Sequence, residues 1–355
     1  MPVFSQHIKD AEVALKEGPF SVTDKEKLPP SGDKNDYASY SRYWWPDPNQ
    51  ADGLPYIRRD GETNPASQSL KESDRQRIGA LGENTEILGL AYYLTGDEKY
   101  AKKAAELIHV WFLEEATRMN PNVNHAQCRP GHNDGTKSGV LDGRLLIKAL
   151  EASLLIKNSL SFSEANHKSL KDWAAKYLEW LTNNKMALDE AESKNNHGTY
   201  YDLQAIYFAL YADNYEVAAR IAEKFEKHRI LSQIQPDGSM PEEIARTRPL
   251  FYSIYNLHAM FLVAQLAKKV DVDLWKKGDE ESRLRVGLDN LIPYVDSNNK
   301  WPQKTIGEAD RMEMLPILQM ANQAYPSGDY LNFVEKLPEE ERKIQRTNLA
   351  FPLVR

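Results

Sequence analysis

The stretch LGENTEILGLAYYLTGDEKYAKKAAELIHVWF, Leu81 to Phe112, decides the fold class of this chain. Two apolar segments of helical length flank a Gly-Asp turn, which ends one helix and begins the next. The same order recurs as LQAIYFALYADNYEVAARIAEKF (203–225) and, more weakly, as ILQMANQAYPSGDYLNFVEKL (317–337). Repeated helical hairpins, with little strand-like alternation, predict an all-α fold, an (α/α) toroid or incomplete barrel.

The chain is long enough for one large domain, and we expect a single catalytic domain over residues 1–355. Its N-terminal part contains a long irregular segment, residues 29–68, which includes YSRYWWPDPNQADGLPYIRRDGETNP (40–65). Pro, Gly, Asp and Asn are too frequent there for a helix or a central strand. Its aromatic residues argue against disorder, so we expect an ordered, lid-like segment.

Charge and cysteine content exclude several classes of protein. The formal net charge is -7, so the overall basic character of a nucleic-acid-binding protein is absent, and a polyanion could bind only at a local cluster of Arg and Lys. The single cysteine, Cys128, cannot form an internal disulfide or a thiolate metal site. No apolar run approaches membrane-span length. The start MPVFSQHIKD lacks the apolar core of a secretory signal, so the protein is either cytoplasmic or begins after a removed signal.

Three polar segments interrupt the helical pattern: KNNHGTYYDLQA (194–205), QPDGSMPEEIARTRPLFYSIYNLHAM (235–260) and NHAQCRPGHNDGTKSGVLDGRLL (124–146). Common signatures for nucleotide binding, serine hydrolysis and metalloproteolysis are absent from the chain. Any chemistry is therefore expected in these three segments.

The segment 235–260 places arginines at the start of a predicted helix and tyrosines on one of its faces. Arg246 and Arg248 lie at or before the helix start, where backbone donors also favour anions. Tyr252 lies four residues after Arg248 and three before Tyr255, so the three share a face. The alternative, which spacing alone favours, is a surface ion pair with the glutamates 242–243 and two core tyrosines.

The other two segments offer polar side chains of the same kind. Asn196 and His197 could donate to an acid group or accept a proton; alternatively, Asn196 caps a helix and His197 makes a structural hydrogen bond. In the segment 124–146 a polar loop could contact substrate through His125, Gln127, Arg129 and His132. The spacing of its histidines and Asp134 fits no zinc signature, so no metal site is predicted.

Together, YWWPDPNQADGLPYIRRDGETNP, KNNHGTYYDLQ and DGSMPEEIARTRPLFYSIYNL resemble the alginate lyase superfamily of polysaccharide lyases. The chain is most similar to the bacterial branch that carries the YWWPDP segment, such as polysaccharide lyase family 38. The resemblance extends from about Tyr40 to Ile317. It implies an (α/α) toroid that cleaves a 1,4-linked polyuronate, alginate or glucuronan, by metal-independent β-elimination, without a cofactor.

The resemblance also implies roles for individual residues. In such enzymes an Asn-His pair flanks the uronate carboxylate, and this pair matches Asn196 and His197. The proton-transferring tyrosine matches Tyr252, with Tyr255 as a competitor one turn away. The arginine that steadies the site matches Arg246 or Arg248.

The irregular N-terminal segment acquires a role by the same resemblance. Tyr43, Trp44 and Trp45 could form a stacking wall or lid over the sugar, and Arg58 and Arg59 could hold neighbouring carboxylates. The alternative is that the tryptophans fill a hydrophobic seam of the toroid.

Two other functions remain open at this point. A glycoside hydrolase on the same helical fold would need two opposed carboxylates, for which Asp134 and Asp142 are candidates. A non-catalytic carbohydrate-binding scaffold would use the same helices without turnover. The expected partner is an anionic polysaccharide, neither nucleic acid nor membrane, and the oligomeric state is not predicted. From this substrate class we expect a periplasmic or secreted protein, while a cytoplasmic location stays open.

Overall fold

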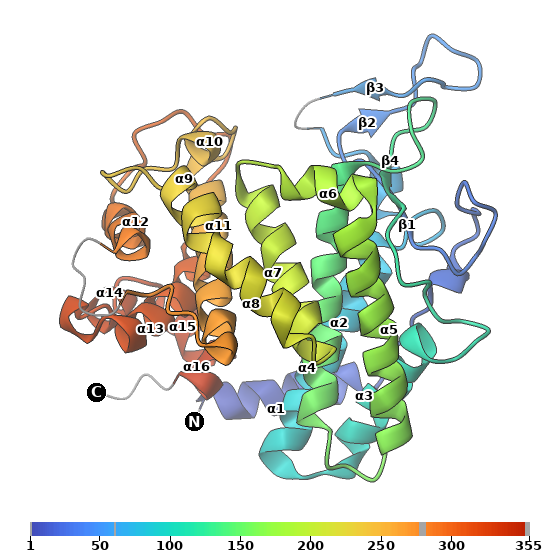
Figure 1. Cartoon of the computed structure of the whole chain (residues 1–355), viewed down its shortest axis with the longest axis horizontal. Helices are drawn as coiled ribbons and strands as arrows, with labels where there is room; N and C mark the ends of the chain where they lie inside the picture. Colours follow the sequence, from blue (N-terminus) through green and yellow to red (C-terminus); the bar gives the residue numbers. More distant parts are fainter. Residues whose placement is uncertain (1, 60–61, 277–281, 352–355) are drawn as a thin grey trace. The chain divides into compact units, whose positions relative to one another are not determined.

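The computed structural model describes residues 2–59, 62–276 and 282–351, most of which are helical or connect helices (Figure 1). The chain divides into two compact units, one of Ile8–Glu190 and one of Met1–His7 with Ala191–Arg355. The division falls within two helices, α1 (Pro2–Ala14) and α6 (Lys185–Ala191). The single domain over 1–355 stays a prediction.

The unit Ile8–Glu190 is built on the first predicted hairpin. α2 (Arg75–Thr95) is followed by Gly96, whose φ of 71° is the left-handed conformation that glycine adopts without strain. Asp97 then caps α3 by accepting a hydrogen bond from the Lys99 backbone N–H at 3.1 Å. α2 packs against both α3 and α4. The helices are α2 (Arg75–Thr95), α3 (Glu98–Phe112), α4 (Leu146–Leu155) and α5 (Glu164–Asn183), with 3-10 turns η1 (Val22–Asp24), η2 (Pro65–Gln68) and η3 (Lys137–Leu145).

The predicted irregular segment contains two short sheets. β1 (Ala38–Tyr40) pairs in parallel with β4 (His125–Cys128), and β2 (Trp44–Trp45) pairs antiparallel with β3 (Ile57–Arg58). The sequence did not predict this pairing, because strands of two to four residues leave no periodic pattern. Residues 60–61 of the segment 29–68 lie outside the described residues.

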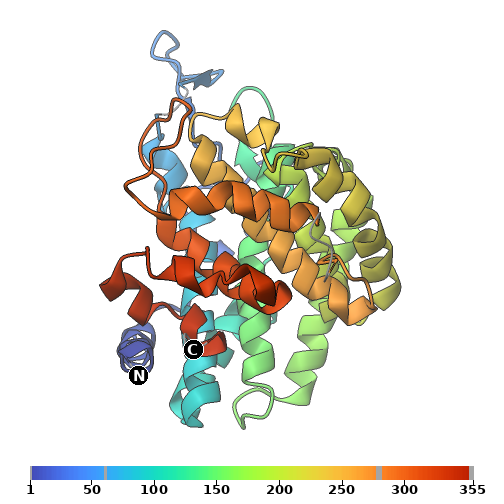
Figure 2. The same cartoon turned by 90° about the vertical axis from the view of Figure 1, so that its left-hand side faces the viewer.

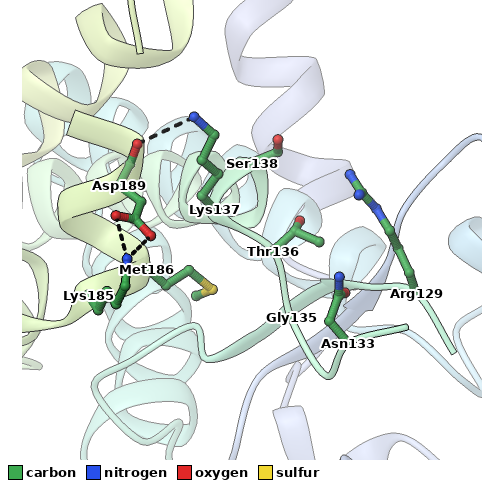
Figure 3. A pocket seen from close by; sticks show the side chains of 9 residues that line it. All are labelled: Arg129, Asn133, Gly135, Thr136, Lys137, Ser138, Lys185, Met186 and Asp189. Atoms are coloured by element: carbon green, nitrogen blue, oxygen red, sulfur yellow. Dashed lines mark hydrogen bonds and ion pairs between the residues drawn. The ribbon is translucent and has the colours of Figure 1, made fainter. Parts of the chain in front are cut away.

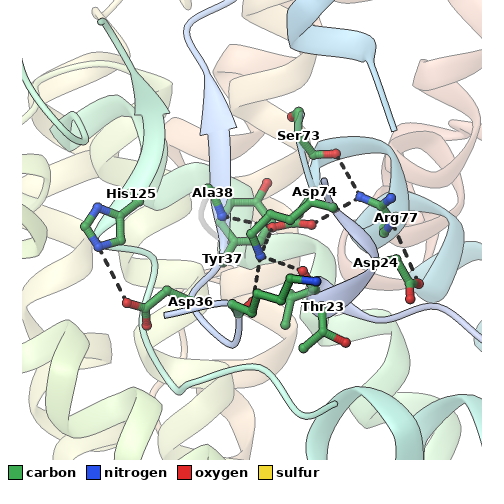
Figure 4. Close-up of polar contacts among 12 residues, drawn as sticks. Thr23, Asp24, Asp36, Tyr37, Ala38, Ser73, Asp74, Arg77 and His125 are labelled. Atoms are coloured by element: carbon green, nitrogen blue, oxygen red, sulfur yellow. Dashed lines mark hydrogen bonds and ion pairs between the residues drawn. The ribbon is translucent and has the colours of Figure 1, made fainter. Parts of the chain in front are cut away.

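The buried Asp74 carboxylate joins this segment to the start of α2 (Figure 4). The Lys25 Nζ lies 3.0 Å from the Asp74 carboxylate, and both side chains are fully buried. The same carboxylate accepts a hydrogen bond from the Ala38 backbone N–H at 3.0 Å, directly at β1. Removing one partner of such a pair leaves an uncompensated buried charge, which costs about 3–5 kcal/mol.

The second unit contains the other two predicted hairpins. α7 (Asn196–Tyr211) and α8 (Tyr215–Phe225) form the second one. The third consists of α13 (Met314–Ala324), a 3-10 turn and the short α14 (Leu331–Val334). α11 packs against α7, α12 and α13, and Figure 2 shows the C-terminal helices in orange and red. The helices are α7 (Asn196–Tyr211), α8 (Tyr215–Phe225), α9 (Leu231–Gln233), α10 (Pro241–Ile244), α11 (Pro249–Ala267), α12 (Arg283–Leu291), α13 (Met314–Ala324), α14 (Leu331–Val334), α15 (Glu339–Ile344) and α16 (Thr347–Ala350), with a π-helical turn η4 (Glu226–Ile230) and 3-10 turns η5 (Lys268–Val270), η6 (Ile292–Val295), η7 (Arg311–Glu313) and η8 (Pro326–Gly328).

One apolar helix is longer than the sequence analysis expected. Pro249–Val270, α11 with its 3-10 extension, is long and apolar enough to cross a membrane by length and composition alone. Buried side chains line α11 along most of its length, as in the core helix of a globular unit, and such a helix meets the same criteria.

Candidate active site

The Asn-Asn-His junction lies at the start of α7. Asn195, not Asn196, is the capping residue, because its side chain accepts a hydrogen bond from the His197 backbone N–H at 3.2 Å. Asn196 is therefore the first residue of the helix, and its side chain is available for another interaction. Asn196 is only 1% exposed, whereas His197 is half-buried.

Glu243, from α10, holds Asn196 in place. Its carboxylate accepts hydrogen bonds from the Asn196 backbone N–H at 2.5 Å and from the Asn196 side-chain amide at 2.7 Å. Burial raises the pKa of the Glu243 carboxyl, while these two hydrogen bonds and the charges of Arg246 and His197 oppose the rise. Glu243 is thus a buried hydrogen-bond partner rather than the surface ion-pair partner that the sequence alternative proposed.

Arg246 and Tyr252 are in direct contact. The Arg246 guanidinium lies over the Tyr252 ring, 3.9 Å from its centroid. Arg248 points elsewhere: it lies over the Phe251 ring at 4.6 Å and donates a hydrogen bond to the Glu308 carbonyl at 3.0 Å. Of the two candidate arginines, the structure places Arg246 at the tyrosine.

Tyr255, the competitor for the tyrosine role, is packed between two other rings. Its ring lies 4.2 Å from that of Tyr200 and 5.8 Å from that of Phe251, near-parallel to both. The Tyr255 carbonyl also accepts a hydrogen bond from the Tyr200 hydroxyl at 3.3 Å. Tyr255 is therefore packed against Tyr200 and Phe251, whereas Tyr252 contacts Arg246.

A second buried residue, Arg229 from the π-helical turn η4, fixes the chain just before α7. It donates hydrogen bonds to the backbone carbonyls of Ser193 at 2.9 Å and Ala191 at 2.6 Å, and to the Asp202 carboxylate at 2.7 Å. Gly198 makes room for this arginine, since a Cβ there would lie 2.1 Å from the Ser193 carbonyl oxygen and 2.5 Å from an Arg229 nitrogen.

Four of the candidate residues lie in one cluster, and two residues that support it, Glu243 and Arg229, were not among the candidates. Asn196, His197, Arg246 and Tyr252 come together through Glu243. The sequence around Glu243, PEEIAR, gives little indication that this residue supports a site, and no pattern marks Arg229. Both residues act through contacts with segments that are distant in the chain.

The predicted substrate-binding residues of the other unit form a group of their own. On the β2–β3 hairpin, Trp44 pairs with Arg58 across the strands, and the Arg59 guanidinium lies 5.0 Å from the centre of the Trp45 ring. The Trp45 indole N–H donates to the Glu62 carbonyl at 3.1 Å. Both tryptophans are half-buried, so part of each ring remains accessible to solvent.

The loop after β4 completes this group. The Arg129 guanidinium lies 4.7 Å from the centre of the Trp44 ring, and the His132 ring meets Trp44 edge-on at 4.9 Å. A His132 ring nitrogen contacts the Tyr56 carbonyl at 2.7 Å, which joins the loop to the hairpin. Trp44, Trp45, Arg58, Arg59, Arg129 and His132 are called the aromatic-basic group below.

Three other predicted contacts have structural partners. The His125 ring nitrogen lies 3.6 Å from the Asp36 carboxylate (Figure 4). Gln127 donates to the Ser138 carbonyl at 3.2 Å and to Asp142 at 3.4 Å. Tyr43 is half-buried, and its carbonyl accepts a hydrogen bond from the Arg59 backbone N–H at 2.8 Å. Substrate contact by these three residues stays a prediction.

Arg129 also borders an open hollow of about 550 Å³ (Figure 3). Lys137 and Lys185 line it, and both contact Asp189: Lys185 through the carboxylate at 2.7 Å and Lys137 through the backbone carbonyl at 3.4 Å. Basic residues outnumber acidic ones in this lining, so the hollow is suited to an anionic ligand.

The two carboxylates considered for glycoside hydrolysis lie in different surroundings. Asp142 is 1% exposed and accepts hydrogen bonds from the Tyr37 hydroxyl at 3.0 Å and the Ser39 hydroxyl at 2.8 Å. Asp134 is exposed. A carboxylate so enclosed is not placed to reach a glycosidic bond, so this pair does not support hydrolysis.

Cys128 is placed as an unreactive thiol. Its Sγ donates to the Asn133 carbonyl at 3.3 Å, and burial raises the pKa of the thiol to about 11. Within the described ranges, no group of three or more His, Cys, Asp or Glu residues is arranged to hold a metal ion.

Comparison with known proteins gives a consistent result. The sequence model of the alginate lyase family matches residues 21–301. The crystal structure of an alginate lyase from Bacteroides ovatus superposes with a TM-score of 0.92 at 37% sequence identity, covering 99% of this chain and 93% of that one. No curated protein sequence matches the chain.

More distant structures share the fold alone. Alginate lyase A1-III from Sphingomonas species A1 superposes with a TM-score of 0.57 at 14% identity, covering 92% of this chain and 89% of that one. A histidine-to-alanine variant of A1-III, complexed with a tetrasaccharide, gives the same TM-score at 13% identity, covering 89% and 86%. These matches confirm the predicted fold class, an all-α toroid-type fold built from helical hairpins.

Proposed function

The chain belongs to the alginate lyase family of polysaccharide lyases, and we propose that it cleaves the 1,4-linked polyuronate alginate by β-elimination at Tyr252. The observation that carries this proposal is the cluster in which Glu243 orients Asn196 and Arg246 covers Tyr252. Glucuronan, which offers the same leaving-group geometry as mannuronate, is the second substrate to test.

The reaction removes the proton on C5, which lies α to the uronate carboxylate and is only weakly acidic. Negative charge then develops on that carboxylate, so donors placed beside it lower the barrier. The half-buried His197 and the guanidinium of Arg246 supply positive or donating groups. Asn196 has a second amide hydrogen besides the one that Glu243 accepts.

The proton transfers balance with a single tyrosine. The Tyr252 oxygen, as phenolate, accepts H5 as the C5–H bond breaks. The C4–C5 double bond forms while the C4–O4 bond breaks, and the leaving O4 takes a proton from the Tyr252 hydroxyl. The products are a 4,5-unsaturated uronate end and a new chain end, with no external oxidant, reductant or water.

The stereochemistry of the substrate assigns the base. In mannuronate and glucuronate, H5 and O4 lie on the same face of the sugar, so Tyr252 can serve both. In guluronate H5 lies on the opposite face, and His197 is the base we propose for it. Replacing His197 with Gln should therefore reduce cleavage of guluronate blocks more than cleavage of mannuronate blocks.

The aromatic-basic group supports polyuronate binding. Guanidinium groups recognise carboxylates through paired hydrogen bonds, and indole rings provide flat surfaces for sugars. We propose that Arg58 and Arg59 hold carboxylates of a polyuronate chain while Trp44 and Trp45 border its sugar rings.

The decisive experiment incubates the protein with mannuronate, guluronate and glucuronate polymers and with hyaluronan while ultraviolet absorbance is followed. A lyase produces absorbing unsaturated ends, whereas a hydrolase produces reducing ends without absorbance. A scaffold protein binds without releasing either product. No absorbance with any of these polymers would overturn the proposal. Since the proposed step uses side chains alone, activity should also survive treatment with a chelator.

We also propose that the protein works in the periplasm or outside the cell, where a polymeric substrate is met. Immunodetection in fractionated cells of the source organism tests this. Finding the protein only in the cytoplasmic fraction would overturn it.

A further inference from the structure

The start of α11 and the segment 300–311 enclose a hollow of about 210 Å³. This volume is below the roughly 300–1,000 Å³ typical of sites for drug-sized ligands, so the hollow suits one sugar ring rather than an oligosaccharide. Aromatic side chains, Phe251 and Trp301, contribute to its lining.

The lining is strongly basic. Arg248, Lys300 and Arg311 line the hollow, against one acidic residue, Glu308. Arg248 uses one guanidinium nitrogen for the Glu308 carbonyl, and the Arg311 Nε donates to the Tyr294 carbonyl at 3.0 Å. A guanidinium has five N–H donors, so each arginine retains donors for a carboxylate.

The hollow is attached to the catalytic cluster within the same unit. The Ile306 backbone N–H donates to the Thr247 carbonyl at 2.9 Å, between Arg246 and Arg248 in sequence. Phe251, which lines the hollow, lies 5.2 Å from the Tyr252 ring, centroid to centroid. A sugar residue in the hollow would therefore lie close to Tyr252.

We propose that this hollow is a binding subsite for one uronate residue adjacent to the residue that reacts at Tyr252. Its carboxylate is held by Arg248, Lys300 and Arg311, and its ring lies against Trp301. This assigns Arg248 to substrate positioning and leaves Arg246 at the tyrosine. The inference rests on the proposed function, because it takes the ligand to be part of a polyuronate chain.

Binding is tested in the Tyr252→Phe background, which should hold substrate without turnover. Calorimetric titration with mannuronate tetrasaccharide should show Kd raised about tenfold by Lys300→Ala and by Trp301→Ala, the loss expected for one charge-assisted contact or one aromatic wall. The matched control is Lys304→Ala, because Lys304 is an exposed lysine of the same segment that does not line the hollow. Its Kd should not change.

The active enzyme gives an independent readout. Lys300→Ala should raise KM for long oligomannuronates about tenfold, leave kcat within about twofold, and change the lengths of the products. Carboxyl-reduced oligomers should bind wild type and Lys300→Ala equally, since the lost interaction is with the carboxylate. Arg248→Ala is less informative alone, because Arg248 also anchors the segment through Glu308.

Two failures are distinguishable. If wild type produces no unsaturated ends, the proposed function fails. If wild type is active but Lys300→Ala and Trp301→Ala match Lys304→Ala in Kd, KM and product lengths, the subsite alone is overturned. If Lys300→Ala lost as much affinity for carboxyl-reduced oligomers as for native ones, the subsite would also be overturned.

Discussion

Tyr252 and Tyr255 lie one turn apart on α11, and their surroundings differ. Tyr252 is half-buried beneath the Arg246 guanidinium, whereas Tyr255 is packed between Tyr200 and Phe251. We expect Tyr252→Phe to lower kcat on mannuronate polymers by about 100-fold or more, the usual contribution of a positioned acid-base group. Tyr255→Phe should retain most of the activity.

The measurement is the initial rate at which ultraviolet absorbance increases as purified variants form unsaturated ends. Binding of tetrasaccharide to Tyr252→Phe should remain near the wild-type level, which separates lost chemistry from lost folding. Full activity in Tyr252→Phe together with an inactive Tyr255→Phe would shift the proton transfer to Tyr255.

Glu243 acts through Asn196 and is a positioning residue. Glu243→Gln keeps the size of the side chain, but its amide group meets one of the two Asn196 donors instead of accepting from it. We expect an unfolding free energy lower by about 1–3 kcal/mol, with kcat reduced more than KM is raised, because Asn196 acts mainly in the transition state.

The neighbouring Glu242, which is exposed, provides the matched control. Glu242→Gln should leave kcat, KM and the unfolding midpoint at wild-type values. If Glu243→Gln lost stability but kept the wild-type kcat, Glu243 would have a purely structural role.

At the residue scale, the sequence could not show which contacts the candidate site residues make. The run of amides before His197 predicted a helix start, yet the capping residue is Asn195, and Asn196 is freed to contact Glu243. Spacing could not show this, because the partner lies 47 residues further along the chain. The choice between Arg246 and Arg248 likewise required their side-chain directions.

At the scale of elements, the start of α7 depends on a glycine. A Cβ at Gly198 would lie 2.1 Å from a backbone carbonyl oxygen. A backbone atom cannot move away by a change of rotamer, as the end of a flexible side chain can. Gly198→Ala should therefore destabilise the protein by about 1–3 kcal/mol or more, as overpacking does. Activity should fall as well, since Asn196 and His197 begin the same helix.

The control is a glycine within another helix. Around Gly79, in α2, no atom beyond its own stretch of helix backbone lies within 4 Å of the position that a Cβ would take. Gly79→Ala should stabilise by about 0.5–1 kcal/mol, because alanine loses less backbone entropy in a helix. Equilibrium denaturation should show the two variants shifting in opposite directions; equal shifts would contradict the crowding at Gly198.

The helical hairpins were predictable because each is a local pattern. A Gly-Asp turn between two apolar helical segments places α2 and α3 without any knowledge of distant contacts. The parallel pairing of β1 with β4 was not predictable from the sequence, because hydrogen bonds between distant parts of the chain join the two strands. The Arg229 clamp at α7 is of the same long-range kind.

At the scale of the whole molecule, net charge and substrate charge have the same sign. A chain of formal net charge -7 can attract a polyanion only through local groups of basic side chains. Both units have such a group: Arg58, Arg59 and Arg129 in one, and Arg248, Lys300 and Arg311 in the other. The repeats predicted the fold class, but the grouping of these charges required the structure.

The pH dependence of stability should depend on the His125–Asp36 pair. The neighbouring Asp36 carboxylate raises the pKa of the His125 imidazole against the effect of burial. Burial alone would raise the pKa of the Asp36 carboxyl, but the neighbouring polar groups of His125, Asn120, Ser31 and Asn122 lower it below its usual range.

The two shifts define a window of pH. A raised histidine pKa stabilises the fold fully below the unfolded value of about 6.5, and this contribution is lost as pH rises through the folded pKa. A lowered aspartate pKa stabilises the fold above about 3.9, and this contribution is lost as pH falls. The pair therefore contributes most between about pH 4 and 6.5.

Asp36→Asn should lower Tm most in that window, and the difference from wild type should narrow as pH rises beyond the folded His125 pKa. The new side-chain amide can still accept a hydrogen bond from Asn120. The substitution removes the negative charge that favours protonated His125. Thermal unfolding of wild type, Asp36→Asn, His125→Gln and the double variant, measured from acid to alkaline pH, isolates the coupling. If the pair is responsible, the second substitution adds no further pH dependence to the first; a Tm difference that stays constant with pH would show instead that Asp36 stabilises only through its neutral hydrogen-bond partners.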